Sequence, residues 1–256
     1  MKNLKTEISN WLNSYLEKNK LKCFVVGVSG GVDSAVVSTL CAETGVRTIV
    51  INIPIRSSDK NTELSTLHCK NLSEKYSNVE TLNIDASNAF NAFLGDMHQS
   101  VSPNGLAQAN TKSRLRMMAL YYVATANAGI VVGTGNKVED FGVGFYTKYG
   151  DGGVDISPIA DLTKTQVRSL AKDLMVDDKI VSAPPTDGLW EDSRTDEDQI
   201  GASYEELEWA METQKKMKDM SNREKQVYRI YKSFNKKNSH KMQPIPIFKL
   251  RGRNAK

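Results

Sequence analysis

Short apolar runs alternate with segments of helical periodicity along the first half of the chain. The runs have the length and composition of buried strands and lie at 23–28, 47–53, 79–84 and 129–133. The helical segments lie at 33–43, 62–76, 86–93 and 111–127, and one more, which contains Ile8, Leu12, Tyr15 and Leu16, precedes the first strand. Strands that alternate with helices form βαβ units. The pattern therefore predicts an α/β fold, a single doubly wound (Rossmann-like) domain whose parallel sheet of about five strands is flanked by helices.

The character of the chain changes after residue 133. Residues 134–158 are rich in glycine and charge, which is typical of a functional loop. Helices are predicted at 162–174, with Thr163 as N-cap, and near 203–217 and 222–235. The acidic stretch 191–198 is expected to be exposed, and the basic tail 236–256 to be irregular. No linker divides residues 1–256. We expect one domain, with a core at about 22–175 and a C-terminal helical region and basic tail at 176–256.

Composition narrows the class of protein. The 256 residues are 39% hydrophobic and 25% charged, which excludes a disordered chain or a disulfide scaffold. The net charge of +4 does not require a nucleic-acid partner. No apolar run is long enough to cross a membrane, and the three cysteines lack CxxC spacing. We therefore expect a cytoplasmic protein that acts on small molecules, without a nucleic-acid or membrane partner.

The strongest local signal is the segment 27–34, Gly-Val-Ser-Gly-Gly-Val-Asp-Ser, between the first predicted strand and its helix. Adjacent glycines let the backbone approach an anion, and the amides at the helix start face that anion. Ser29 and Ser34 add hydroxyl donors, and Asp33 beside an anion suits a bound Mg²⁺ ion. The alternative is an ordinary βα turn in which Ser or Asp caps the helix. The spacing is neither a Walker loop nor the dinucleotide fingerprint.

This loop resembles the pyrophosphate-binding SGGxDS signature of the N-type ATP pyrophosphatases, which split ATP to AMP and pyrophosphate while a substrate oxygen is adenylated. Further segments are similar to the NAD synthetases within that group, and the similarity covers almost the whole chain. They lie at 110–116, 133–139, 144–158, 162–164, 183–186, 200–204 and 240–241. The stretch 140–144 is one residue longer than in some of these relatives.

The resemblance implies an ATP site. Its implied ATP-binding residues are Gly27, Val28, Ser29, Gly30, Gly31, Val32, Asp33, Ser34, Thr134, Lys164 and Thr186. ATP would be the co-substrate and Mg²⁺ the cofactor, held by Asp33 and Glu139, while Lys164 would offset charge on the leaving pyrophosphate. Without the resemblance, a helix-surface charge explains Glu139 as well as a metal ligand does, and a helix-start residue is the favoured interpretation of Lys164.

The resemblance also implies a site for deamido-NAD (nicotinic acid adenine dinucleotide). The implied residues are Asn110, Arg114, Lys148, Asp155, His240 and Lys241. Asp151 is implied in the ammonia pocket, so that Asp33, Asp151 and Lys164 are the implied catalytic residues. On a helix, Arg114 and Arg116 diverge by about 200°, whereas Lys112 and Arg116 share a face. A solvated basic helix face is the alternative interpretation of these cations.

The implied activity is that of a C–N ligase. Deamido-NAD would be amidated with ammonia to NAD⁺, AMP and pyrophosphate through an adenylated carboxylate, in a homodimer that meets along the helix of Arg114 and the stretch 117–123. Only about 20 residues precede the first strand, too few for an amidase domain, so we expect free ammonia as the nitrogen source. Two alternatives stay open: another amide-forming or tRNA-thiolating ATP pyrophosphatase, and a nucleotide-binding protein without turnover.

Overall fold

A parallel sheet lies at the centre of the computed structural model, which describes residues 3–56, 59–186, 188–190 and 194–249. Its strands are β1 (Phe24–Gly27), β2 (Thr48–Asn52), β3 (Val79–Asn83) and β4 (Ile130–Val131), in the order β3-β2-β1-β4. All neighbouring pairs run parallel, with Phe24 beside Thr48 on one side and beside Ile130 on the other. The predicted α/β fold is confirmed.

The described part of the chain holds four strands, one fewer than the predicted number of about five. The place of the fifth is taken by a single parallel bridge between Val132 and Ile156. Ile156 follows a turn that ends at Gly152 and precedes another that begins at Pro158, so the extended stretch there is too short for a full strand.

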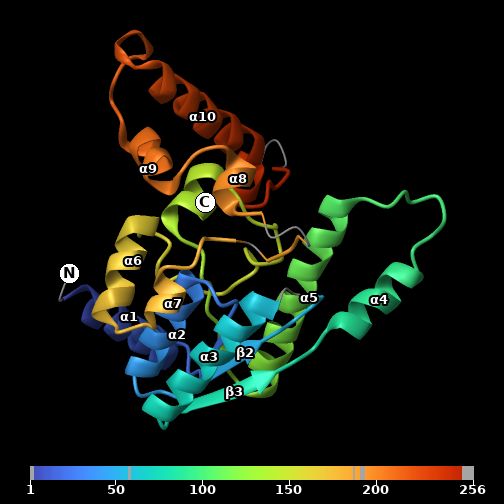
Figure 1. Cartoon of the computed structure of the whole chain (residues 1–256). Helices are drawn as coiled ribbons and strands as arrows, with labels where there is room; N and C mark the ends of the chain where they lie inside the picture. Colours follow the sequence, from blue (N-terminus) through green and yellow to red (C-terminus); the bar gives the residue numbers. More distant parts are fainter. Residues whose placement is uncertain (1–2, 57–58, 187, 191–193, 250–256) are drawn as a thin grey trace.

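Helices cover both faces of the sheet (Figure 1). Alternate residues of β1 face opposite sides, because Phe24 and Val26 belong to one buried cluster and Val25 to another. The first face carries α1 (Leu4–Lys18), α2 (Val32–Glu43), α3 (Asp59–Lys75), α6 (Lys164–Asp173) and α7 (Asp178–Val181). The second face carries α4 (Ser87–Gly95) and α5 (Gly105–Ala126). This arrangement is that of a doubly wound fold.

A further hydrophobic cluster lies outside the sheet. It is formed by η1 (Lys137–Val143), α8 (Asp196–Ile200), α9 (Tyr204–Glu212) and α10 (Asn222–Met242), with η2 (Met217–Asp219) between the last two helices. Figure 1 shows α9 and α10 projecting together from the sheet layer. The buried side chains include Val138, Val143, Tyr204, Leu207 and Val227. The segment that follows β4 therefore packs against the C-terminal helices rather than against the sheet.

Several boundaries differ from the sequence-based expectation. The predicted loop 134–158 contains a π-helix, η1, whose wide i→i+5 turn accommodates one extra residue in this stretch. Helix α5 begins at Gly105, capped by the Asn104 side chain, rather than near residue 111. Helix α10 runs to Met242, so the tail is helical until there, because Asn235 and Asn238 bind the carbonyl groups of Gly142 and Val143 at 2.8 Å each.

Among the described residues, no helix is both long and apolar enough to cross a membrane.

His68 makes the packing of α2 against α3 sensitive to acid. Its Nε2 lies 2.8 Å from Ser38 Oγ, and burial lowers its pKa from 6.5 to about 4. The unfolded chain takes up this proton near pH 6.5, whereas the folded chain does so only near pH 4, so stability falls as the pH drops through this window. We expect a loss of about 3 kcal/mol in the free energy of unfolding.

Denaturant unfolding between pH 7 and 4 measures the free energy of unfolding of the wild type and of two variants. In His68→Gln the acid-dependent loss should shrink by that amount, and in His98→Gln, which removes a histidine from an exposed loop, it should stay as in the wild type. Equal pH dependence in all three proteins would contradict the assignment to His68.

Candidate active site

The segment between β1 and α2 forms a preorganised anion cradle. Gly30 has φ +88°, and a Cβ there would lie 2.6 Å from the carbonyl oxygen of Asn61, so only glycine fits. The Ser29 N–H donates to Ser34 Oγ at 3.2 Å, and Ser34 Oγ donates to the Gly31 carbonyl at 2.9 Å. Gly31 caps α2, whose first amides and dipole therefore point at the loop. This geometry suits a phosphate group.

Asp33, Glu139 and Lys164 meet beside this loop, from three different elements. The Lys164 Nζ donates to Glu139 Oε1 at 2.9 Å and makes a short contact with Asp33 Oδ2. The lysine side chain is 3% exposed. Burial by itself would lower the pKa of Lys164, but the two carboxylates raise it above its usual range. Burial would raise the pKa of Glu139, but Lys164 and hydrogen bonds hold it below its usual range. The ammonium and the Glu139 carboxylate are therefore both charged.

Asn136 and Tyr204 hold the carboxylates of Asp33 and Glu139 in position. Asn136 donates to Asp33 Oδ1 at 3.2 Å, and its own Oδ1 accepts from the first amides of η1. Tyr204, fully buried at the start of α9, donates to Glu139 Oε1 at 2.5 Å. Lys164 opens α6, whose N-cap Thr163 forms a capping box with Gln166. The position of each charged group is thus set by a helix start.

Asp33 and Glu139 suit a Mg²⁺ ion as ligands. Their carboxylates converge on one cation, the Lys164 ammonium, and oxygen is the donor that Mg²⁺ prefers. In the part of the chain that the structure describes, no group of three or more His, Cys, Asp or Glu side chains is placed to hold a metal. Phosphate and water oxygens would therefore complete the shell, as is usual for this ion.

A cavity of about 600 Å³ opens at the carboxyl ends of the strands. Of the predicted site residues, the ones that line it are Gly27, Val28, Ser29, Asn110, Arg114, Thr134, Glu139, Lys148, Asp151, Thr186, His240 and Lys241. Residues 30–34 continue the loop into α2, where Val32 belongs to the core cluster. Asp33 and Lys164 reach the cavity through their contact with Glu139.

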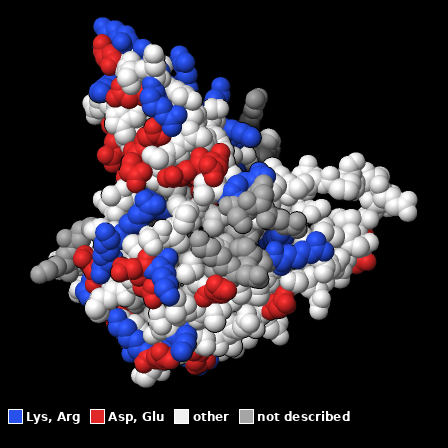
Figure 2. Space-filling view, in the orientation of Figure 1, with Lys and Arg blue, Asp and Glu red and all other residues white. Residues whose placement is uncertain are grey.

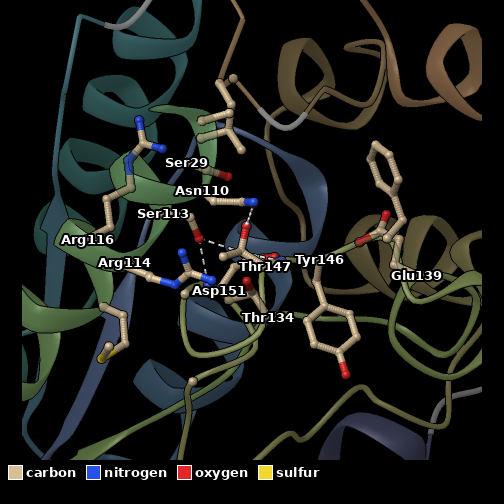
Figure 3. A pocket seen from close by; sticks show the side chains of 18 of the residues that line it. Ser29, Asn110, Ser113, Arg114, Arg116, Thr134, Glu139, Tyr146, Thr147 and Asp151 are labelled. Carbon is tan, nitrogen blue, oxygen red and sulfur yellow. Dashed lines mark hydrogen bonds between the residues drawn. The ribbon is translucent and has the colours of Figure 1, made fainter. Parts of the chain in front are cut away.

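Asp151 lies at the centre of a hydrogen-bonded group within this cavity, shown in Figure 3. Its Oδ1 accepts from Ser113 Oγ at 2.6 Å and from the Thr147 N–H at 3.0 Å. Thr147 Oγ1 in turn donates to Asn110 Oδ1 at 2.7 Å. Burial raises the pKa of Asp151, although the hydrogen bonds from Ser113 and Thr147 oppose this rise. A buried carboxylate of this kind can bind ammonium or accept a proton.

Cationic side chains surround the same end of the cavity. Arg114 donates to the Lys148 carbonyl oxygen at 3.3 and 3.4 Å, and Lys148 Nζ donates to the His240 carbonyl oxygen at 3.2 Å. Lys241 Nζ donates to the carbonyl oxygens of Gly144 and Tyr146 at 2.6 and 2.7 Å. The last turn of α10 is thereby fastened to the loop that carries Asp151.

Asp155 has a different environment from the one implied by the resemblance. It does not appear in the cavity lining, and its oxygens accept from Tyr121 Oη at 2.9 Å and from the Val131 N–H at 2.9 Å. Asp155 thereby holds α5 and β4 together.

The acidic stretch 191–198 also differs from expectation. Asp196 is only 5% exposed, and its carboxylate lies 3.1 Å from Tyr204 Oη. Residues 191–193 lie outside the described residues.

Sequence reasoning missed several residues of the site. Arg116 donates to the carbonyl oxygen of Ile53 at 3.1 Å and lines the cavity next to the loop. Ser113, Asn136 and Tyr204 support the three acids as described above. These four residues lie inside the segments that carry the resemblance, at 110–116, 133–139 and 200–204. The resemblance therefore pointed to the right segments, but nothing in the sequence separates the supporting residues from their neighbours.

The chain is similar to known proteins along almost its full length. A family model described as NAD synthase matches residues 4–245. A protein of Methanosarcina acetivorans named NH(3)-dependent NAD(+) synthetase is 33% identical over 250 residues, which are 95% of this chain and 96% of that one. A protein of the same name from Finegoldia magna is 36% identical over 203 residues, 79% of this chain and 80% of the other.

A solved structure gives the same result for the fold. The NMN synthetase of Francisella tularensis is 30% identical and superposes with a TM-score of 0.88 over 97% of this chain and 98% of its own. The family model, the relatives and the fold agree with one another. The chain therefore belongs to the NAD synthase family.

Proposed function

We propose that this protein is an ammonia-dependent NAD synthetase, a C–N ligase that converts deamido-NAD, ATP and ammonia into NAD⁺, AMP and pyrophosphate. The observation that carries the proposal is the arrangement of one cavity in a chain of this family. A phosphate loop with two converging carboxylates lies at one part of it, and a buried carboxylate with cationic neighbours at another.

In the first step, an oxygen of the nicotinate carboxylate attacks the α-phosphorus of ATP, and the bond from that phosphorus to the pyrophosphate oxygen breaks. Ser29, Ser34 and the first amides of α2 hold the phosphates, and Lys164 offsets the charge that develops on pyrophosphate. Asp33 and Glu139 would hold Mg²⁺, which when bound neutralises phosphate charge. Thr134 and Thr186 position the nucleotide from the β4 end and the loop after α7.

In the second step, ammonia attacks the activated carbonyl carbon and AMP leaves with the bridging oxygen. Asp151 accepts a proton from the attacking nitrogen, for which its raised pKa suits it. Arg114, Lys148, His240, Lys241 and Asn110 hold the anionic substrate around it.

Incubation of the purified protein with ATP, Mg²⁺, deamido-NAD and ammonium tests the proposal. NAD⁺, AMP and pyrophosphate should form in equal amounts, and glutamine in place of ammonium should give no NAD⁺ when traces of ammonia are removed enzymatically. Absence of NAD⁺ with ammonium, or efficient turnover with glutamine alone, would overturn it.

The Francisella tularensis structure favours a second candidate, in which nicotinic acid mononucleotide is the substrate and NMN the product. That protein, named NMN synthetase, superposes with a TM-score of 0.88 over nearly the whole chain. The chemistry would be identical and only the adenylate half of the substrate would be absent. The ratio of kcat/KM for the dinucleotide and the mononucleotide, measured in one preparation, decides between the two.

We further propose a cytoplasmic homodimer. The three cysteines are free and buried, which suits a reduced compartment. The end of α4, the segment that follows it and the start of α5 expose Phe93, Met97, Val101 and Leu106, and residues 86–111 contain only one charged side chain, Asp96. Figure 2 shows this segment almost entirely free of charged side chains, unlike the rest of the same face. An exposed apolar surface of this kind is typical of a contact with a second copy.

The dimer can be tested on the exposed face of α5. Met118 and Tyr122, one turn apart, are 59% and 78% exposed. We expect sedimentation at twice the chain mass of 28.4 kDa for the wild type and at the chain mass for Met118→Glu/Tyr122→Glu. Trp11→Glu, on the exposed side of α1, is the control and should stay dimeric. A fully active wild-type monomer would contradict the dimer.

A further inference from the structure

The Lys164 ammonium occupies the place between the two carboxylates where a metal ligated by both would lie. It contacts Asp33 and Glu139 at the same time, and no other cation is recorded in contact with either acid among the described residues. The side chains of the three residues are 3%, 14% and 18% exposed, in the order Lys164, Asp33, Glu139. The pair of acids is therefore already neutralised in part by the chain itself.

The surroundings favour the ammonium in this position. Tyr204 presents its ring to Lys164 Nζ, 4.7 Å from the ring centre, while its hydroxyl binds Glu139. The capping box at Thr163 fixes the backbone from which Lys164 extends. The four-carbon side chain of Lys164 is flexible, so the ammonium can move while the backbone stays in place.

The charges of Asp33, Glu139 and Lys164 decide whether the ammonium or a metal ion lies between the two acids. With Lys164 in place and both acids ionised, the three side chains carry a net charge of −1, and a divalent cation that bound both acids would face an ammonium at close range. Removing the ammonium without a replacement would leave two buried carboxylates unpaired, which is costly. When the triphosphate of ATP arrives at the adjoining loop, it offers the ammonium another anionic partner and releases the acids.

We propose that Lys164 acts as a built-in counter-ion that closes the metal site until ATP binds. The ammonium holds Asp33 and Glu139 in the free protein, and it exchanges these partners for phosphate oxygens as Mg²⁺ enters with ATP. Metal without nucleotide is then excluded, and ATP and Mg²⁺ bind as a coupled pair. This inference deepens the metal-dependent adenylation proposed above and rests on it.

Thermal unfolding in the absence of nucleotide tests the exclusion directly. MgCl₂ should leave the Tm of the wild type unchanged but raise that of Lys164→Met, by about 5 to 10 °C at a Mg²⁺ concentration about a hundredfold above its Kd. Lys164→Arg, which keeps the positive charge, is the matched control and should not respond. In the double variant Lys164→Met/Asp33→Asn the response should disappear, because one carboxylate ligand is lost.

Isothermal titration of the wild type with MgCl₂ keeps the inference testable if Lys164→Met fails to fold. No binding with a Kd below about 1 mM is expected without nucleotide. The analogue of ATP with a methylene group between the α- and β-phosphorus cannot be cleaved at the α-phosphorus. It should bind at least about tenfold more tightly with Mg²⁺ than without it. Tight Mg²⁺ binding by the free wild type, or a Lys164→Met protein that folds and ignores Mg²⁺, would overturn the inference. Neither measurement involves deamido-NAD, so a failure of the proposed reaction would not affect them.

Discussion

Asp33→Asn is expected to lower the rate of pyrophosphate release by about 100-fold to 1000-fold, because the variant loses a carboxylate that would hold Mg²⁺ at the phosphates. Glu139→Gln should have a similar effect, since both acids converge on the same cation. The loss should appear in kcat, because the affected charge develops on the leaving pyrophosphate. A continuous pyrophosphate assay at saturating Mg²⁺ measures it.

The control for these two variants is Asp161→Asn. Asp161 is also paired with a lysine, Lys137 at 3.1 Å, but its side chain is 95% exposed. We expect wild-type turnover from this variant, because exposed ion pairs contribute little. Far-ultraviolet circular dichroism should show that all three proteins keep their helices. Turnover near that of the wild type in a folded Asp33→Asn protein would remove this residue from the metal site.

Asp151→Asn is expected to uncouple the two half-reactions. The amide can still accept the hydrogen bonds from Ser113 and Thr147, so the loop should keep its shape, but it cannot take a proton from the attacking nitrogen. We expect NAD⁺ formation to fall by about 100-fold or more while a burst of pyrophosphate from the first step is retained. Rapid quench with labelled ATP measures both products in one experiment.

Ser113→Ala separates the charge of Asp151 from its orientation. This variant removes the hydrogen bond to the carboxylate and the one that Ser113 Oγ accepts from the Asp151 N–H, but it keeps the acid itself, so NAD⁺ formation should fall much less, by about tenfold. If Asp151→Asn lost the pyrophosphate burst as well, its role would belong to the first step, contrary to the proposal.

The sheet and the phosphate loop were predictable because both depend on local pattern. The apolar runs at 23–28 and 47–53 became adjacent parallel strands, and the glycines of the loop lie where the chain turns from β1 into α2. Such features require only neighbours in sequence. The resemblance added the distant acids, since Asp33 and Glu139 lie more than a hundred residues apart and no periodicity joins them.

The supporting contacts could not be predicted, because they depend on how distant elements pack. Tyr204 reaches Glu139 across 65 residues of sequence, and Asn136 reaches Asp33 across 103. The end of α10 was placed too early because its basic composition suggested a solvated tail. In the structure two asparagines and Lys241 bind the η1 region and extend the helix to Met242. The pairing of Lys164 with both acids became visible only in three dimensions.

Transfer of an oxygen isotope tests the central claim most directly. Deamido-NAD with oxygen-18 in its carboxylate is incubated with the protein, ATP, Mg²⁺ and ammonium, and the products are analysed by mass spectrometry. If the carboxylate attacks the α-phosphorus, one labelled oxygen appears in AMP and the other stays in the amide of NAD⁺. Unlabelled AMP, or ADP and phosphate in place of AMP and pyrophosphate, would contradict an adenylated intermediate and with it the proposed chemistry.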